Sequence, residues 1–267
     1  MTKNYFCLLI LVLVLGGCDM FETSCYDANI SGDTYINIKN ITRISSVCED
    51  KDTICFAVIS DTQGWYDETE EIVAQLNKRT DVDFVIHAGD IADFGATKEY
   101  LWQRDILNKL KAPYVVVIGN HDCLGDGEQV FTTVFGKKNF AFTAGKVRFV
   151  CLNTNALEYD YSEPVPDFDF MEEQMADSAL YEKTIIVMHA PPYSEQFDNN
   201  VAKIFEKDVL AFKHSLFCVH GHNHHLQKRN LYEDGMIYYG CDCAKNKCYL
   251  VFTVYPDNHY NYEAVYF

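Results

Sequence analysis

Basic residues are scarce in this sequence. It contains 22 lysines and arginines against 39 aspartates and glutamates, which gives a formal net charge of −17. Non-specific binding to nucleic acid or to an anionic membrane surface needs clustered lysine and arginine, so no nucleic-acid partner is expected. An anionic substrate is still compatible with this charge, because bound divalent cations would dominate the local field.

The sequence also lacks internal repeats, low-complexity blocks and any clear linker after residue 52. Its 267 residues fit one large domain or two small ones, and a hydrophobic content of 48% suffices for a full core. We therefore expect one domain at 53–267. Residues 18–52 are polar with weak alternation around 35–38, which predicts a tether with an edge strand.

The N-terminal apolar run, at 6–15, is too short to span a bilayer. It follows Lys3 and precedes Leu15-Gly16-Gly17-Cys18, which resembles the lipobox of bacterial lipoproteins. This pattern predicts a signal peptide at 1–17, lipidation of Cys18, export, and anchoring to a bacterial cell-envelope membrane on its periplasmic or surface face. The alternative is an ordinary secretory signal in which Cys18 is incidental.

Cysteine is absent from the polar motifs that follow the predicted strands, which argues against a structural zinc site. Of eleven cysteines, Cys7 leaves with the signal peptide and Cys18 carries lipid, which leaves nine. An odd number cannot all pair within one chain. The candidate disulfides closest in sequence are Cys48 with Cys55, and Cys248 with Cys241 or Cys243.

Apolar runs and amphipathic segments alternate from residue 54 onward. The first half predicts strands and helices in the order β-α-β-α-β, at 54–60, 67–78, 84–87, 97–111 and 114–118. This order implies parallel strands joined by right-handed crossovers. The second half predicts a hairpin at 139–153, a loop or small cap at 154–167, helices at 170–181 and 201–214, strands at 184–188 and 216–219, and antiparallel strands to the end.

Polar motifs follow the carboxyl ends of the predicted strands, where open α/β sheets bind ligands. They are Asp61-Thr62-Gln63, Gly89-Asp90, Gly119-Asn120-His121-Asp122, His189 and Gly221-His222-Asn223-His224. The carboxylate, amide and imidazole groups in these motifs are numerous enough to bind two hard or borderline cations. A glycine before the ligand lets the backbone turn sharply toward a shared centre.

The ordered motifs resemble those of the calcineurin-like metallophosphoesterases over roughly residues 54–255. This resemblance implies an α/β fold, namely a four-layer α-β-β-α sandwich with two mixed sheets. It also implies two metal ions (Mn, Fe or Zn) at the strand ends. One would be held by Asp61, Gln63, Asp90 and His224, and the other by Asp90, Asn120, His189 and His222.

The resemblance also assigns roles to the residues beside the ligands. His121 would donate a proton to the leaving oxygen or stabilise the transition state, and Asp122 would orient His121. Asp93 is more typical of a loop cap than of a ligand. The family usually has histidine where this chain has Gln63, which offers a neutral oxygen and is a poorer ligand.

We therefore predict a hydrolase that cleaves a phosphomonoester or phosphodiester with a metal-bridged hydroxide. Its partners would be a phosphate-ester substrate of unknown identity and a membrane, through the lipid on Cys18. The alternative is a catalytically weak or inactive metal-binding surface lipoprotein, in which Gln63 has weakened the first metal site.

Overall fold

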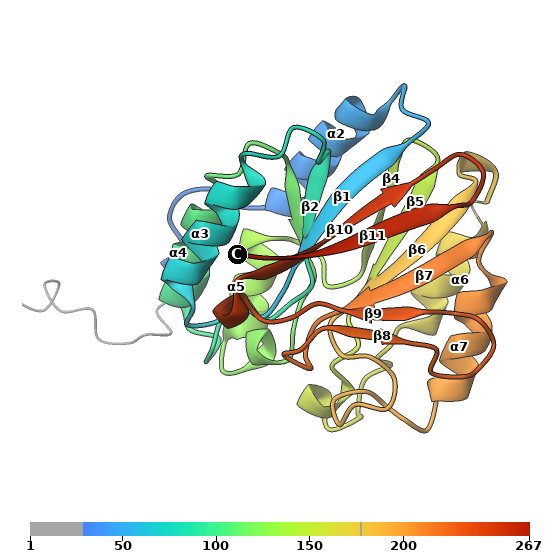
Figure 1. Ribbon diagram of the computed structural model, residues 1–267. Helices are drawn as coiled ribbons and strands as arrows, with labels where there is room; N and C mark the ends of the chain where they lie inside the picture. The colour runs from blue at the N-terminus through green and yellow to red at the C-terminus, as the bar shows by residue number, and fades with distance from the viewer. Residues whose placement is uncertain (1–28, 177) are drawn as a thin grey trace, which may run out of the picture.

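The computed structural model describes residues 29–176 and 178–267. Two mixed β-sheets face each other, and helices cover both outer faces (Figure 1). This confirms the predicted α/β class and the four-layer α-β-β-α sandwich. The predicted signal peptide, Cys18 and the first part of the tether lie outside the described residues.

The first sheet is built around three parallel strands whose order in the sheet matches their order in the chain. Antiparallel β10 pairs with β1, and β11 pairs with β10. The full order is β11 (Tyr260–Tyr266), β10 (Cys248–Val254), β1 (Ile54–Ile59), β2 (Phe84–His87) and β3 (Tyr114–Val116). The strands predicted at 54–60, 84–87 and 114–118 are thus confirmed.

The second sheet also has a parallel centre with antiparallel edges. Strands β5, β6, β7 and β9 run parallel, whereas β4 and β8 run antiparallel to their neighbours. Its order is β4 (Phe140–Ala144), β5 (Val147–Leu152), β6 (Lys183–Met188), β7 (Ser215–His220), β9 (Tyr238–Gly240) and β8 (Gln227–Arg229). Strands β4 and β5 form the hairpin predicted at 139–153.

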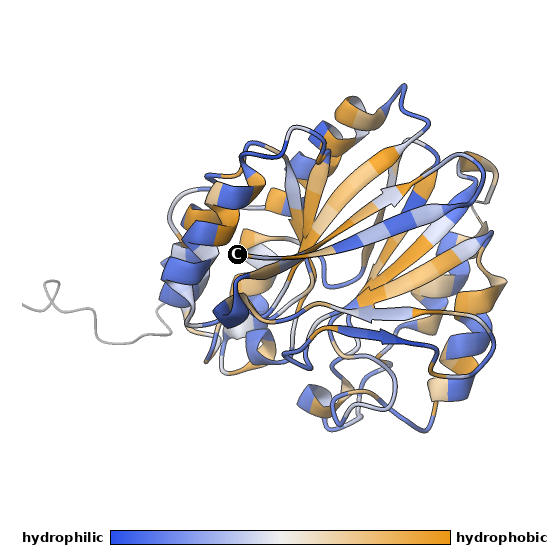
Figure 2. Cartoon of the chain, in the orientation of Figure 1, coloured by the Kyte–Doolittle hydropathy of each residue, from blue (hydrophilic) through white to orange (hydrophobic). Residues whose placement is uncertain are grey.

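Helices close the outer face of each sheet by burying one apolar side. The first sheet is covered by α3 (Tyr66–Leu76), α4 (Thr97–Leu107) and α5 (Gly127–Val134). The second is covered by α6 (Phe168–Ala176) and α7 (Ala202–Ala211). Figure 2 shows the hydrophobic colours concentrated on the central strands, whereas the exposed edge strand β8 is hydrophilic.

The core between the sheets is rich in phenylalanine. Phe56 of β1 stacks on Phe84 of β2 at 5.4 Å and meets Phe149 of β5 edge-on at 5.0 Å. Aromatic rings bury large apolar areas and favour such offset and edge-to-face contacts. These contacts join the two sheets and fix how their strand ends face each other.

The edge strand predicted near 35–38 is wrong, because this segment belongs to helix α2 (Ile36–Cys48). Its buried residues recur at helical spacing, but two of them are asparagines. Asn37 donates to the Val116 carbonyl at 2.8 Å and accepts from the Val116 N–H at 2.9 Å, and Asn40 donates to the Tyr114 carbonyl. The two side-chain amides therefore pair with the free edge of β3 as a further strand would.

The candidate disulfides are not formed, and all eight cysteines within the described residues are free thiols. Cys48 packs in the core between the sheets, whereas Cys55 packs on the helix-covered face of the first sheet. Side chains on opposite faces of one sheet cannot be bridged without moving the backbone. Within residues 29–176 and 178–267, we find no helix that is both long and apolar enough to cross a membrane.

Candidate metal centre

The carboxyl ends of strands from both sheets meet at one edge of the sandwich. The predicted ligands lie in the turns that follow β1, β2, β3, β6 and β7. Four of these ligands have left-handed backbone conformations, namely Asp61, Asp90, His222 and His224 (φ of 54°, 60°, 69° and 51°). Such conformations are unfavourable for residues other than glycine, and they cluster at functional sites.

Glycines let these turns approach each other closely. A Cβ atom on Gly119 would lie 2.1 Å from Asp90 Oδ1, and one on Gly89 would lie 2.5 Å from His189 Nδ1. Neither distance is tolerated by real side chains, so any larger residue would push the ligands apart. The glycines of the sequence motifs therefore serve the close approach of ligands from different strands.

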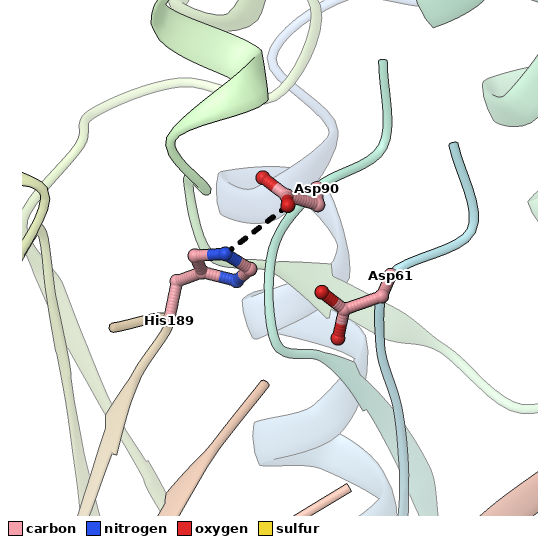
Figure 3. Close-up of side chains that lie close together, drawn as sticks. All are labelled: Asp61, Asp90 and His189. Atoms are coloured by element: carbon pink, nitrogen blue, oxygen red, sulfur yellow. Dashed lines mark ion pairs between the residues drawn. The ribbon is translucent and has the colours of Figure 1, made fainter. Parts of the chain in front are cut away.

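Asp61, Asp90 and His189 form the buried centre of the site. Each offers an atom, and these atoms lie within 4.8 Å of one another (Figure 3). His189 Nε2 lies 3.2 Å from Asp90 Oδ2. Burial lowers the pKa of His189, but Asp90 and Asp61 outweigh it and raise this pKa to about 9.

The four residues predicted for the first metal come together around Asp90. His224 Nε2 lies 3.2 Å from Asp61 Oδ1. Gln63 Nε2 lies 3.3 Å from Asp90 Oδ2 and 3.5 Å from His224 Nε2. A rotation of the Gln63 amide by half a turn would present its oxygen at the same place.

The four residues predicted for the second metal also converge. Asn120 Oδ1 lies 3.1 Å from His189 Nε2 and 3.1 Å from His222 Nδ1. His189 Nδ1 donates to the Ala88 carbonyl at 2.8 Å, which leaves Nε2 directed at the site. The structure thus brings all seven predicted ligands to one place, with Asp90 Oδ2 between the two groups.

His222 has the opposite orientation from His189. Its Nε2 lies 3.0 Å from Glu195 Oε1, and its Nδ1 faces the site. Burial, and then the charge of His189, lower the pKa of His222, which favours a neutral ring with one proton. If Nε2–H donates to Glu195, the lone pair of the neutral ring is on Nδ1, the nitrogen that faces the site. Sequence reasoning did not identify Glu195, because a single glutamate in an exposed loop carries no distinctive pattern.

His121 lies beside the two groups, half-exposed. Its backbone N–H donates to Asp90 Oδ1 at 3.0 Å, and its Nδ1 donates to the Asp93 carbonyl at 2.7 Å. The Asp93 carboxylate is also close, at 3.6 Å from His121 Nδ1. Asp93 therefore fixes the ring, and its position three residues after Asp90 was the only sequence signal for it.

The prediction that Asp122 orients His121 is wrong for a direct contact with the imidazole ring, whose Nδ1 bonds the Asp93 carbonyl instead. The Asp122 carboxylate is buried and accepts four backbone N–H bonds of 2.8 to 3.0 Å, from Gly119, Asp90, Ile91 and Ala92. With its oxygens used in this way, Asp122 ties the turn after β3 to the turn after β2. Burial and the neighbouring charge of Asp90 raise the pKa of Asp122.

The donor set fits a bound cation. Gln63 Oε1 is buried and has no hydrogen-bond partner, which is costly for an amide oxygen. Asp61 and Asp90 are two buried carboxylates whose side-chain partners are imidazoles and the Gln63 amide. Buried carboxylates need positive charge nearby, and convergent oxygen and imidazole atoms supply what divalent cations prefer.

The fold and these strand-end residues are matched by one family of phosphoesterases. Residues 55–226 match the family model for calcineurin-like phosphoesterases, which covers more than half of the chain. The chain belongs to the calcineurin-like phosphoesterase family, which is a metal-dependent family.

Individual relatives are more distant. A 3′,5′-cyclic-nucleotide phosphodiesterase of Nostoc sp. is 24% identical over 131 residues, which are 47% of this chain and 49% of that protein. The chain thus matches about half the length of this relative. Two solved structures share the fold with TM-scores of 0.60. They are the purple acid phosphatase of yellow lupin (14% identity, 81% of this chain and 52% of that one) and GAP50, the anchor in the inner membrane complex of Plasmodium (13%, 81% and 85%).

Proposed function

We propose that this protein is a dinuclear metal-dependent phosphoesterase that hydrolyses phosphomonoesters or phosphodiesters. The observation that carries the proposal is the convergence of seven predicted ligands around Asp90 Oδ2, which lies 3.3 Å from Gln63 Nε2 and 3.2 Å from His189 Nε2. One metal would be held by Asp61, Gln63, Asp90 and His224. The other would be held by Asp90, Asn120, His189 and His222.

When bound, two such cations would supply positive charge against the phosphate and would lower the pKa of a bound water. The protein supplies the positions of the ligands and the proton for the leaving group. The Asp93 carbonyl accepts from His121 Nδ1, so the imidazolium form of His121 carries a second proton on Nε2 that it can donate to the leaving oxygen. Asp122 keeps His121 near Asp90 by holding both turns through their backbone.

The phosphodiesters include a specific first candidate. The Nostoc relative is named a 3′,5′-cyclic-nucleotide phosphodiesterase, so cyclic nucleotides are the first natural diesters to assay.

The competing candidate, a metal-binding lipoprotein of little or no activity, is favoured by one observation. Gln63 stands where the family usually has histidine, and its amide oxygen is a poorer ligand than an imidazole nitrogen.

The test compares p-nitrophenyl phosphate with bis-p-nitrophenyl phosphate as substrates for the purified protein, with Mn, Zn, Fe or no metal added. Metal-dependent turnover that disappears in Asp90→Ala supports the proposal. Asp50→Ala removes an exposed carboxylate elsewhere and serves as the matched control. Full activity in Asp90→Ala would refute the proposal, and metal binding without turnover would favour the competing candidate.

We also propose that the protein is exported and anchored to a bacterial cell-envelope membrane through a lipid on Cys18. The support is the sequence pattern of residues 1–18 alone. Cells that express the protein are expected to incorporate labelled palmitate into it. When such cells are extracted with detergent, the protein is expected to partition into the detergent phase. Cys18→Ser is expected to abolish both, and retention of the label in that variant would refute this anchor.

A further inference from the structure

The peptide group between Asp93 and Phe94 is held on both sides. Its carbonyl accepts from His121 Nδ1 at 2.7 Å, and its N–H donates to Glu99 Oε2 at 3.0 Å. Glu99 also accepts from the Ala96 N–H at 3.1 Å, which fixes the start of α4. The backbone of Phe94 is therefore firmly placed beside the proton donor, yet the residue is 61% exposed.

A second exposed apolar side chain flanks His121 from the other turn. The Leu124 N–H donates to the His121 carbonyl at 3.3 Å, and Leu124 is 36% exposed. The turn that follows Phe94 packs against the turn of Leu124, because a Cβ atom on Gly95 would lie only 2.0 Å from the Leu124 carbonyl oxygen. The backbones of Phe94 and Leu124 thus lie on two tightly packed turns, and both turns are hydrogen-bonded to His121.

Two exposed carboxylates lie at this edge, beside His121 and His222. The Asp93 carboxylate lies 3.6 Å from His121 Nδ1, and Glu195 lies 3.0 Å from His222 Nε2. Both carboxylates are at least 40% exposed and so face the solvent from which substrate arrives. A leaving group that carries a second negative charge would be repelled by them, whereas an uncharged one would not.

Water-exposed aromatic and aliphatic side chains gain free energy when an apolar group covers them. His121 is the proposed proton donor to the leaving oxygen, so the leaving group lies next to His121 during the reaction. We propose that Phe94 and Leu124 form the contact surface for the leaving group, and that the preferred substrates are phosphate esters of uncharged, apolar alcohols such as aryl alcohols. This inference rests on the proposed function and specifies its substrate class.

The test compares two monoesters that differ in the leaving group, 1-naphthyl phosphate and glycerol 3-phosphate, with metal-loaded protein. Phe94→Ala is expected to lower kcat/KM for 1-naphthyl phosphate by about tenfold, and for glycerol 3-phosphate by less than about twofold. Leu124→Ala is also expected to lower kcat/KM more for 1-naphthyl phosphate than for glycerol 3-phosphate. Leu180→Ala removes a 70% exposed leucine that precedes β6, at the opposite end of this strand from His189, and is the matched control.

Because Phe94 is exposed, its replacement is not expected to disturb folding, and the circular dichroism spectrum checks this. Suppose that the wild-type protein hydrolyses both esters. If Phe94→Ala and Leu124→Ala then lower kcat/KM equally for the two esters, or change it for neither ester, this inference alone is overturned. Absence of metal-dependent turnover of any ester by the wild-type protein would overturn the proposed function, and this inference with it. The two failures are therefore distinguishable.

Discussion

Replacing Glu195 with alanine is expected to weaken metal binding at the second site. Glu195 Oε1 lies 3.0 Å from His222 Nε2, on the side of the ring opposite Asn120. Hydrogen-bond partners of this kind fix the tautomer of a metal-binding histidine and typically contribute 10- to 100-fold to metal affinity. The Glu195 side chain is 73% exposed, so water replaces it in part. We expect the lower end, about tenfold, which corresponds to about 1.4 kcal/mol.

The assay is titration of the metal-free protein with Zn or Mn against a chromogenic chelator, which yields an apparent Kd for each site. One of the two sites is expected to weaken in Glu195→Ala, and Glu195→Gln is expected to restore much of the affinity because its amide oxygen also accepts. Glu173→Ala, on the exposed face of α6, is the control. Wild-type affinities in Glu195→Ala would refute the reasoning, since the contact would then contribute nothing to ligand orientation.

Three further predictions concern catalysis, folding and pH. His121→Ala is expected to reduce kcat by about 10²- to 10⁴-fold while the metal content stays unchanged. Asn37→Leu is expected to lower the free energy of unfolding in urea by about 2–5 kcal/mol, because it leaves the buried N–H and carbonyl of Val116 without partners. Burial raises the pKa of Glu206 to about 7, although the Tyr238 hydroxyl opposes the rise. Protonated Glu206 therefore contributes its full stability below pH 4.5, and this contribution is lost as the pH rises through 7. The Tm of the wild type is expected to fall over this pH range, and the Tm of Glu206→Gln is expected to fall less.

Each of these predictions has a result that contradicts it. Loss of metal from His121→Ala would mean that His121 is a ligand rather than a proton donor. Unchanged stability of Asn37→Leu would mean that α2 does not protect the edge of β3. The same decline of Tm between pH 4.5 and 7 in Glu206→Gln and in the wild type would place the titrating group elsewhere.

The parts of the fold that could be predicted are those with strong local signals. Strand β1 is a continuous apolar run that is followed by Ser60 and Asp61, so both the strand and the predicted ligand could be identified from neighbouring residues. Helix α5 (Gly127–Val134) lacks such a signal and could not be predicted. This helix has only eight residues, and its β-branched residues favour strands as much as helices.

Other parts depend on contacts between distant segments. The buried face of α2 includes Asn37 and Asn40, whose role is visible only when β3 lies beside them. Likewise, Asp122 was identified as part of the site, but its four backbone partners come from two turns that meet only in the folded protein. Sequence patterns predict the residue types of the site, whereas the contacts that each acidic residue makes follow from the tertiary structure.

The number of metal ions bound per chain tests the central claim most directly. The purified protein would be dialysed to equilibrium against Mn, Zn or Fe, and the bound metal would be measured by mass spectrometry. Two ions per chain in the wild type, with at least one lost in Asp90→Ala, is the predicted result. At most one ion per chain at saturation with each metal would contradict a dinuclear centre, and would show that Gln63 does not complete the first site.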